Sequence, residues 1–227
     1  MSLIKVCEVT KTYRGGDGVV EALTNVNLQI AEGEFLALMG PSGSGKSTLL
    51  SILGGLNPPT SGKLIIDDID VYSLPPERLA DFRHEYVGFV FQQYQLIPYL
   101  TALENVMLPL AITSRPGKEQ RGMAQIVLDK VGLGSKSLRL PNQLSGGEQN
   151  RVAIARAIVN EPAIIFADEP TGSLDSKTAM ELLALFQTLN QGGLTIIMVT
   201  HNQENLGWVS RTVYIRDGVL VPNPEEA

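Results

Sequence analysis

One short loop sequence constrains the fold of this chain more than any other feature. Residues 40–48 read Gly-Pro-Ser-Gly-Ser-Gly-Lys-Ser-Thr, after an apolar run at 35–39 and before a helical run at 49–53. This is the G-x-x-x-x-G-K-[ST] pattern in the strand–loop–helix context that it requires. Glycines let the loop turn tightly, so that its N–H groups and the positive end of the next helix face a phosphate. The pattern predicts an α/β chain of the P-loop class; a glycine-rich turn that merely caps a helix is the alternative.

The side chains of this loop are expected to contact different parts of a bound nucleotide and its metal ion. Lys46 supplies a mobile positive charge for the outer phosphates, and the hydroxyl of Ser47 suits Mg²⁺. Thr48 is a further candidate phosphate ligand. The candidate nucleotide-binding residues of the loop are Gly40, Ser42, Gly43, Ser44, Gly45, Lys46, Ser47 and Thr48.

A second feature is an apolar strand that ends in two carboxylates. Residues 164–169 read Ile-Ile-Phe-Ala-Asp-Glu, and burying such charges without a cation is costly. Asp168 fits the carboxylate that supports Mg²⁺ beside the phosphate loop. Glu169 fits a base that polarises water at the γ-phosphate, and Pro170 disfavours helical geometry at Glu169. The alternative is a pair of solvated residues that begin a loop.

The segment Leu-Ser-Gly-Gly-Glu at residues 144–148 opens a predicted helix. Ser145 and Glu148 have the spacing of a capping box, which is its structural alternative. A cap alone does not explain Gly146 and Gly147, because each glycine inside a helix costs about 1 kcal/mol relative to alanine. The glycines indicate a close approach to the backbone, and this helix start is a second candidate phosphate site. One nucleotide cannot easily use both sites within a monomer.

Hydrophobic periodicity places these motifs in an α/β core with a helical insertion. Strands are predicted at residues 3–9, 26–30, 34–39, 64–66, 86–91, 163–167, 194–200, 212–215 and 219–221. A turn is expected at 14–18 and another at Asp217-Gly218. Helical segments dominate 94–160, for example at 120–131 and 151–159. An amphipathic helix follows with Ala179, Leu182, Leu183, Phe186 and Leu189 on one face.

Composition argues against several other classes of protein. The 227 residues carry 18 basic and 24 acidic side chains, a net charge of −6, so no nucleic-acid partner is expected. The one cysteine, Cys7, cannot form an intrachain disulfide, which fits a reducing compartment. No apolar run approaches the roughly 20 residues of a transmembrane helix, and the start of the sequence has no signal-peptide core. Any membrane role is therefore expected to come through a partner.

Together and in this order, the motifs resemble the ABC-type ATPases, the nucleotide-binding subunits of ATP-binding-cassette transporters. The resemblance covers essentially the whole chain, and residues 144–148 are its most specific part. It implies one domain of residues 1–227, with a P-loop NTPase (RecA-like) core, an N-terminal antiparallel β subdomain and an α-helical subdomain inserted at about 94–160. It also implies hydrolysis of ATP with Mg²⁺ by a head-to-tail dimer, in which the Ser145 segment of one copy meets the ATP held by Lys46 of the other.

The resemblance assigns roles to residues outside these motifs. Tyr13 would stack on adenine. Gln92 would reach Mg²⁺ and the attacking water, with Gln93 as the adjacent alternative. Asp175 would lie in the loop that crosses the dimer interface, and His201 would contact the γ-phosphate.

Several local sequences are similar to one subfamily, the ATPases of lipoprotein release, macrolide export and cell division (LolD, MacB and FtsE types). These sequences lie at residues 87–92, 96–98, 103–106 and 108–110. The similarity implies a peripheral protein at the cytoplasmic face of the cell membrane, and an integral-membrane permease that docks near Gln92 to Asn105. Export or mechanical transmission across the envelope would be its task. An ATPase of a division-associated or other non-transport complex is the alternative.

Overall fold

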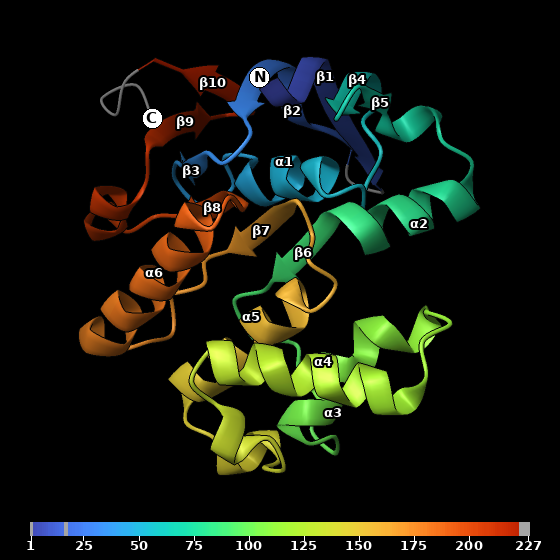
Figure 1. Ribbon diagram of the computed structural model, residues 1–227. Helices are drawn as coiled ribbons and strands as arrows, with labels where there is room; N and C mark the ends of the chain where they lie inside the picture. The colour runs from blue at the N-terminus through green and yellow to red at the C-terminus, as the bar shows by residue number, and fades with distance from the viewer. Residues whose placement is uncertain (1, 16–17, 223–227) are drawn as a thin grey trace.

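The computed structural model describes residues 2–15 and 18–222 of the chain, which form two sheets with helices around them (Figure 1). The larger sheet has six strands in the order β10-β9-β3-β8-β7-β6. These strands are β3 (Phe35–Met39), β6 (Val87–Val90), β7 (Ile164–Asp168), β8 (Thr195–Thr200), β9 (Arg211–Arg216) and β10 (Val219–Val221). β3 pairs in parallel with β8 and β9, and β7 with β6 and β8, whereas β10 runs antiparallel to β9.

The parallel strands bring the polar motifs to one edge of the sheet. β3 and β8 are buried along their whole length, which explains their unbroken apolar sequences. Parallel strands place their carboxyl ends at the same edge, where α/β proteins bind ligands. The loop after Met39, the carboxylates of Asp168 and Glu169 and the side chain of His201 therefore meet there.

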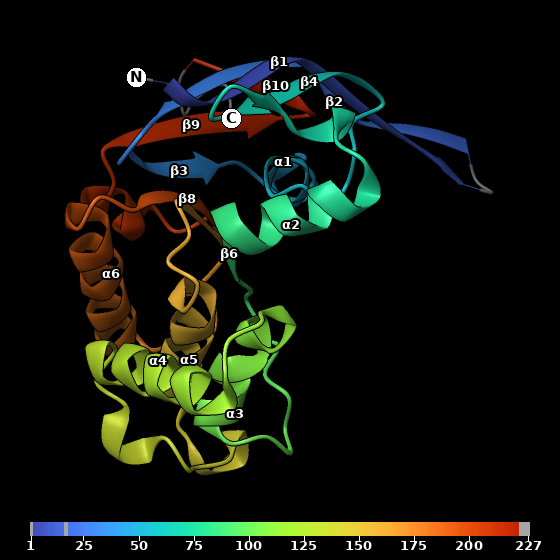
Figure 2. The same cartoon turned by 45° about the vertical axis from the view of Figure 1, so that its right-hand side comes forward.

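A four-stranded antiparallel sheet, in the order β2-β1-β4-β5, lies over the larger sheet with α1 (Lys46–Leu53) between them (Figure 2). Its strands are β1 (Ser2–Gly15), β2 (Gly18–Ala31), β4 (Ser61–Ile66) and β5 (Ile69–Asp70). Apolar side chains from this sheet, from α1 and from β7 share one buried cluster. β1 and β2 are longer than predicted, and register shifts interrupt their pairing. The predicted turn at 14–18 includes Gly16 and Asp17, which lie outside the described residues.

The segment between β6 and β7 is mainly helical and forms a separate layer (Figures 1 and 2). Its helices are α3 (Ala102–Met107), α4 (Gly117–Lys130) and α5 (Gly146–Ile158). They share a second buried cluster with β6, β7 and α6 (Ser176–Gln191). The predicted helices at 120–131 and 151–159 overlap α4 and α5, while residues 94–101 contain no helix.

Hydrophobic periodicity in the sequence indicates the helix α6 but not the helix α2 (Pro76–Tyr86). In α6, Leu182, Leu183 and Phe186 of the predicted apolar face are buried, while Ala179 and Leu189 of that face are partly buried. The sequence analysis did not predict α2, in which only Phe82 is buried, because its apolar stripe is too narrow to show periodicity. Among residues 2–15 and 18–222, no helix is long and apolar enough to span a membrane.

Candidate active site

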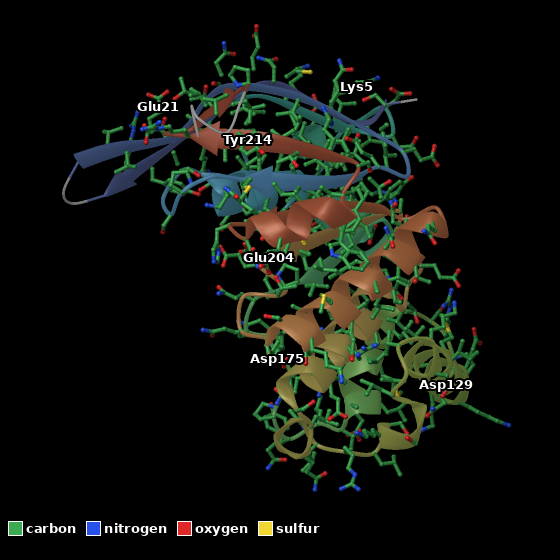
Figure 3. All side chains as sticks on the ribbon, turned by 90° about the vertical axis from the view of Figure 1, so that its left-hand side faces the viewer. Lys5, Glu21, Asp129, Asp175, Glu204 and Tyr214 are labelled. Carbon is green, nitrogen blue, oxygen red and sulfur yellow. The ribbon has the colours of Figure 1, made fainter. Side chains whose placement is uncertain are left out.

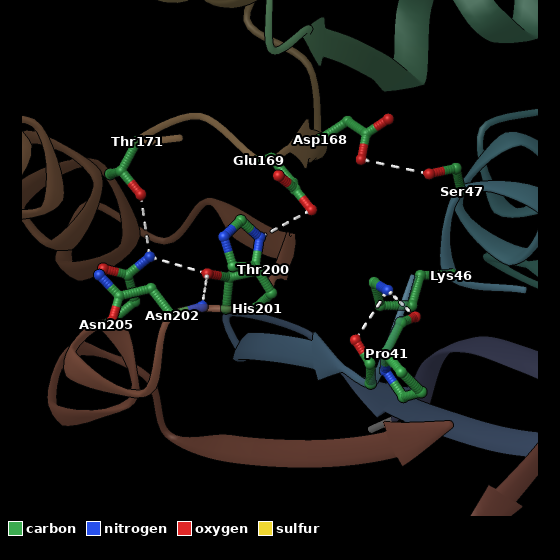
Figure 4. A network of polar contacts seen from close by, with 11 residues as sticks. Pro41, Lys46, Ser47, Asp168, Glu169, Thr171, Thr200, His201, Asn202 and Asn205 are labelled. Carbon is green, nitrogen blue, oxygen red and sulfur yellow. Dashed lines mark hydrogen bonds and ion pairs between the residues drawn. The ribbon is translucent and has the colours of Figure 1, made fainter. Parts of the chain in front are cut away.

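The phosphate loop joins β3 to α1 and holds a buried lysine at its end. Gly45 adopts a φ of 104°, and a Cβ there would lie 2.5 Å from the carbonyl oxygen of Ala22, so glycine is required. The side chain of Lys46 is 7% exposed. Its Nζ donates to the carbonyl oxygens of Gly40 at 2.8 Å and Pro41 at 2.6 Å (Figure 4). Burial lowers the pKa of Lys46, and the nearby carboxylates of Glu169 and Asp168 oppose that shift.

A pocket of about 460 Å³ opens over this loop. Eight of its lining residues were predicted as site residues: Ser42, Gly43, Gly45, Lys46, Ser47, Thr48, Glu169 and His201. Gly40 and Ser44 do not line the pocket. Ser44 is buried, and its Oγ has no hydrogen-bond partner within the residues that the structure describes. The ammonium group of Lys46 donates to backbone carbonyl oxygens and lies at the start of α1. A cation beside the amino-terminal end of a helix suits a phosphate.

The two carboxylates occupy different environments at the end of β7. Asp168 accepts a hydrogen bond from the Oγ of Ser47 at 3.4 Å. Burial and then the charge of Glu169 raise the pKa of Asp168, while Ser47 and Lys46 lower it. Glu169 has a φ of 44°, a left-handed conformation that costs about 1–3 kcal/mol unless its surroundings hold it. Its Oε1 lies 3.0 Å from Nδ1 of His201 (Figure 4).

The oxygen ligands at this edge of the sheet suit a divalent cation that is bound partly by the protein and partly by the substrate. Ser47 and Asp168 offer hard oxygen ligands, which Mg²⁺ prefers. In the part of the chain that the structure describes, no three His, Cys, Asp or Glu side chains gather to hold a metal ion. Mg²⁺ is usually bound through one or two carboxylates plus substrate phosphates, and Asp168 would supply such a carboxylate here.

Several residues of the pocket were missed by the sequence analysis. They are Val20, Glu21 and Ala22 from β2, and Asp217 and Gly218 from the turn between β9 and β10. The backbone N–H of Gly218 donates to the carbonyl oxygen of Ser44 at 3.0 Å, so this turn supports the phosphate loop. The sequence signalled a turn at Asp217-Gly218, but only the strand order places that turn against the loop.

Tyr13 does not line this pocket. Its hydroxyl accepts a hydrogen bond from Nδ2 of Asn57 at 2.6 Å, and Nζ of Lys11 lies 5.1 Å from the ring centroid. Its partner across the strand pair is Val20, which does line the pocket. The structure thus places Tyr13 beside the pocket, with its ring against Lys11.

The start of α5, at Ser145, forms the capping box that the spacing of Ser145 and Glu148 predicts. Ser145 Oγ accepts from the N–H of Glu148 at 3.3 Å, and Glu148 Oε2 accepts from the N–H of Ser145 at 2.9 Å. A Cβ on Gly147 would lie 2.3 Å from Cγ2 of Thr178, so the close approach that the glycines indicated includes α6 of the same chain. Ser145 and Gly147 line a different pocket, of about 390 Å³. A single chain does not bring its two helix starts together.

Gln92 and Asp175 lie on loops near these sites. A Cβ on Gly172 would lie 3.3 Å from Nε2 of Gln92 and 3.4 Å from Oε2 of Glu169, so both side chains border the same glycine. Asp175 caps the exposed start of α6 (Figure 3), where it accepts from the N–H of Thr178 at 3.0 Å. The hydrogen bonds from Thr178 hold the pKa of Asp175 below its usual value.

Comparisons with known proteins agree with this geometry. The family model described as ABC transporter matches residues 23–172. An ABC transporter ATP-binding protein of Thermotoga maritima is 50% identical over 216 residues, which cover 95% of this chain and 92% of that protein. The macrolide export ATP-binding/permease protein MacB of Syntrophobacter fumaroxidans is 48% identical over 98% of this chain, and the match covers 32% of MacB.

A solved structure shares the whole architecture. The ATP-binding cassette MJ0796 of Methanocaldococcus jannaschii, in a dimeric post-hydrolysis state bound to ADP and Pi, superimposes with a TM-score of 0.88 and 47% identity. The match covers 96% of this chain and 97% of that one. It confirms the predicted P-loop NTPase fold with its antiparallel β part and helical part. The chain belongs to the ABC transporter family, as an ATP-binding and ATP-hydrolysing subunit.

Proposed function

We propose that two copies of this chain pair head to tail around two ATP molecules, and that each ATP is hydrolysed between the copies. One observation carries this proposal: the phosphate loop and the Ser145 helix start line separate pockets of one chain. Both starts suit phosphate, so a second copy would supply the missing half of each site. The dimeric state of MJ0796 bound to ADP and Pi supports such pairing.

Within each site, Lys46 binds the outer phosphates. Its bonds to the carbonyl oxygens of Gly40 and Pro41 would be exchanged for bonds to phosphate, in which the donor and the acceptor are both charged. Ser47 and Asp168 would hold Mg²⁺, which when bound supplies neutralisation of charge on the phosphate oxygens. The other predicted loop residues would contribute mainly backbone N–H groups.

Glu169 orients and polarises the attacking water in this proposal. Its contact with His201 directs the carboxylate toward the mouth of the phosphate loop, where both side chains line the pocket. The amide of Gln92 borders Glu169 across Gly172, which supports Gln92 over Gln93 as the residue that reaches the water and Mg²⁺.

Two residues keep roles that follow from the resemblance. Tyr13 would stack on adenine, on the face of the strand pair that it shares with its cross-strand partner Val20, which lines the pocket. Asp175, at the exposed start of α6, would lie in the loop that crosses the dimer interface.

A membrane permease would be the other partner, which places the chain peripherally at the cytoplasmic face of the cell membrane. A groove of about 400 Å³ lies next to the expected docking segment between Gln92 and Asn105. Phe89, Phe91 and the basic Arg83 and Arg156 are among its lining residues, a combination that suits an amphipathic helix with acidic residues. MacB is an ATP-binding/permease protein, which supports a permease partner and an export type of task.

The substitution Glu169→Gln tests the proposal most directly. ATP would still bridge two copies while hydrolysis is slowed, so a stable ATP-bound dimer should accumulate. Size-exclusion chromatography with light scattering, in Mg-ATP, measures the dimer, and phosphate release measures turnover. A variant that stays monomeric and retains the turnover of the unsubstituted chain would contradict both the role of Glu169 and the paired arrangement.

A further inference from the structure

A buried asparagine connects the two loops that carry Glu169 and His201. Asn205 lies in the 3₁₀ helix Gln203–Trp208 and is 2% exposed. Its Nδ2 donates to Oγ1 of Thr171 at 2.9 Å and to Oγ1 of Thr200 at 2.8 Å (Figure 4). Thr171 lies two residues after Glu169, and Thr200 directly precedes His201. One amide group therefore bonds both loops at once.

The surroundings of this amide make its two bonds hard to replace. Thr171 and Thr200 are themselves 8% and 3% exposed. A buried amide donor without a partner is costly, so both threonine hydroxyls are held at fixed positions around the Asn205 nitrogen. Thr200 also accepts from the backbone N–H of Asn202 at 3.1 Å, which adds the start of the same 3₁₀ helix to the network.

The loop held by Thr171 needs such support. Glu169 keeps a left-handed backbone, a conformation that persists only when neighbouring contacts fix it. Its N–H bonds the carbonyl oxygen of Val199 at 3.0 Å, and Nδ2 of Asn150 donates to the carbonyl oxygen of Pro170 at 2.5 Å. Val199 lies in β8, the strand that leads to His201, so one backbone bond already joins the two segments. Asn205 adds a side-chain link between them, closer to His201.

We propose that Asn205 is a positioning residue for hydrolysis: it fixes the loops of Glu169 and His201 to each other, and so maintains the 3.0 Å contact between the carboxylate and the imidazole. This inference rests on the proposed roles of Glu169 and His201. Neither Asn205 nor the two threonines lines the phosphate-loop pocket. Asn205 therefore acts through other residues and does not touch the nucleotide.

Because Asn205 lies outside the nucleotide pocket, we expect its loss to lower kcat and to leave the Kd for ATP almost unchanged. The substitution Asn205→Leu keeps the branched side-chain skeleton of four non-hydrogen atoms but removes both donated bonds. We expect kcat to fall roughly 10- to 100-fold, because small displacements of reacting groups cost that much. The Kd for ATP should change less than about twofold, because β3, the phosphate loop and α1 keep their contacts.

A matched control separates this effect from a general loss of stability. Nδ2 of Asn190 also joins two segments, through the carbonyl oxygens of Gly33 at 2.9 Å and Leu194 at 2.8 Å. These contacts lie at the amino-terminal ends of β3 and β8, away from the site. Asn190→Leu removes the same chemistry, so its melting temperature should fall comparably while kcat stays within about twofold of the unsubstituted value.

The experiment measures kcat, the Kd for ATP by equilibrium dialysis and the melting temperature for Asn205→Leu, Asn190→Leu, Thr171→Val and Thr171→Ser. Thr171→Ser keeps the acceptor hydroxyl and should be at least fivefold more active than Thr171→Val. If Asn205→Leu does not fold, the kcat values of Thr171→Val and Thr171→Ser test the inference instead. Equal kcat values for Thr171→Val and Thr171→Ser, or equal losses of kcat in Asn205→Leu and Asn190→Leu, would overturn the inference.

Glu169→Gln, assayed in parallel, distinguishes a failure of the proposed role of Glu169 from a failure of the proposed role of Asn205. If Glu169→Gln keeps full turnover, the proposed role of Glu169 fails first. If Glu169→Gln loses turnover while Asn205→Leu retains it, only the positioning role of Asn205 is overturned.

Discussion

The two helix starts that suit phosphate are built in opposite ways. α1 begins after Gly45 with no side-chain cap, and Nζ of the buried Lys46 donates to two carbonyl oxygens of its own loop. α5 begins with a complete capping box between Ser145 and Glu148, and Lys136 pairs with Glu148. Lys46 at the first start donates only weakly competing bonds to backbone carbonyls, whereas the second start satisfies the N–H groups of Ser145 and Glu148 with its own side chains. In the proposed dimer, we therefore expect ATP binding to depend mainly on the α1 start, while the α5 start would complete the site of the other copy.

Removal of the lysine should produce the largest effect in this comparison. Lys46→Ala should weaken ATP binding on the order of 100-fold or more, because hydrogen bonds to charged groups are worth about 1.5–3 kcal/mol each. Equilibrium dialysis measures this, with Lys118→Ala on the exposed face of α4 as the control. The nucleotide-free variant should not be less stable, because a desolvated charge is removed. Binding within tenfold of the unsubstituted chain would contradict the account of α1.

Removal of the Ser145 hydroxyl should leave binding to a single chain intact and impair turnover. Ser145→Ala should lower kcat roughly 100-fold, as the loss of one donor to a reacting phosphate or oxyanion does. It should also lower the free energy of unfolding by about 1 kcal/mol through the lost cap. Steady-state kinetics and urea denaturation measure the two effects.

Thr101→Ala is the matched comparison for this loss of a cap, because Thr101 and Glu104 form the same box at the start of α3. The two variants should lose similar stability. The difference between their kcat values then reports what Ser145 contributes to hydrolysis beyond capping. Equal kcat values would mean that α5 is a capped helix and no more.

We expect the smallest effect for the stability that the start of α5 contributes as a function of pH. Lys136, and then Ser145, hold the pKa of Glu148 below its usual value of 4.5. Because the folded pKa is lowered, this stabilisation is complete above pH 4.5 and is lost as the pH falls through the folded value. Glu148→Gln should therefore be less stable at pH 7, by under about 1 kcal/mol for such an exposed pair, and should converge with the unsubstituted chain in acid. Urea denaturation at a series of pH values tests this; a constant difference would count against it.

The sequence predicted the parts of the fold where local signals and packing agree. The run at 35–39 is β3 and the run at 49–53 lies in α1, because a buried parallel strand and a loop rich in glycine leave few other arrangements. The amphipathic pattern of α6 likewise matches the side chains that it buries.

Other parts depend on tertiary contacts that leave no local signal. α2 buries one apolar side chain, so its periodicity is invisible in the sequence. The support of the phosphate loop by Gly218 arises from the pairing of β9 with β3. Asn205 reads as an ordinary loop residue until the order of β7 and β8 places Thr171 and Thr200 beside it.

The most direct test of the head-to-tail account mixes two impaired variants. Lys46→Ala retains the α5 start and Ser145→Ala retains the phosphate loop, so a mixed pair contains one site with both halves intact. ATP turnover is measured for each variant alone and for their mixture at the same total concentration. The account predicts turnover in the mixture well above the average of the separate variants, and a mixture no more active than that average would contradict it.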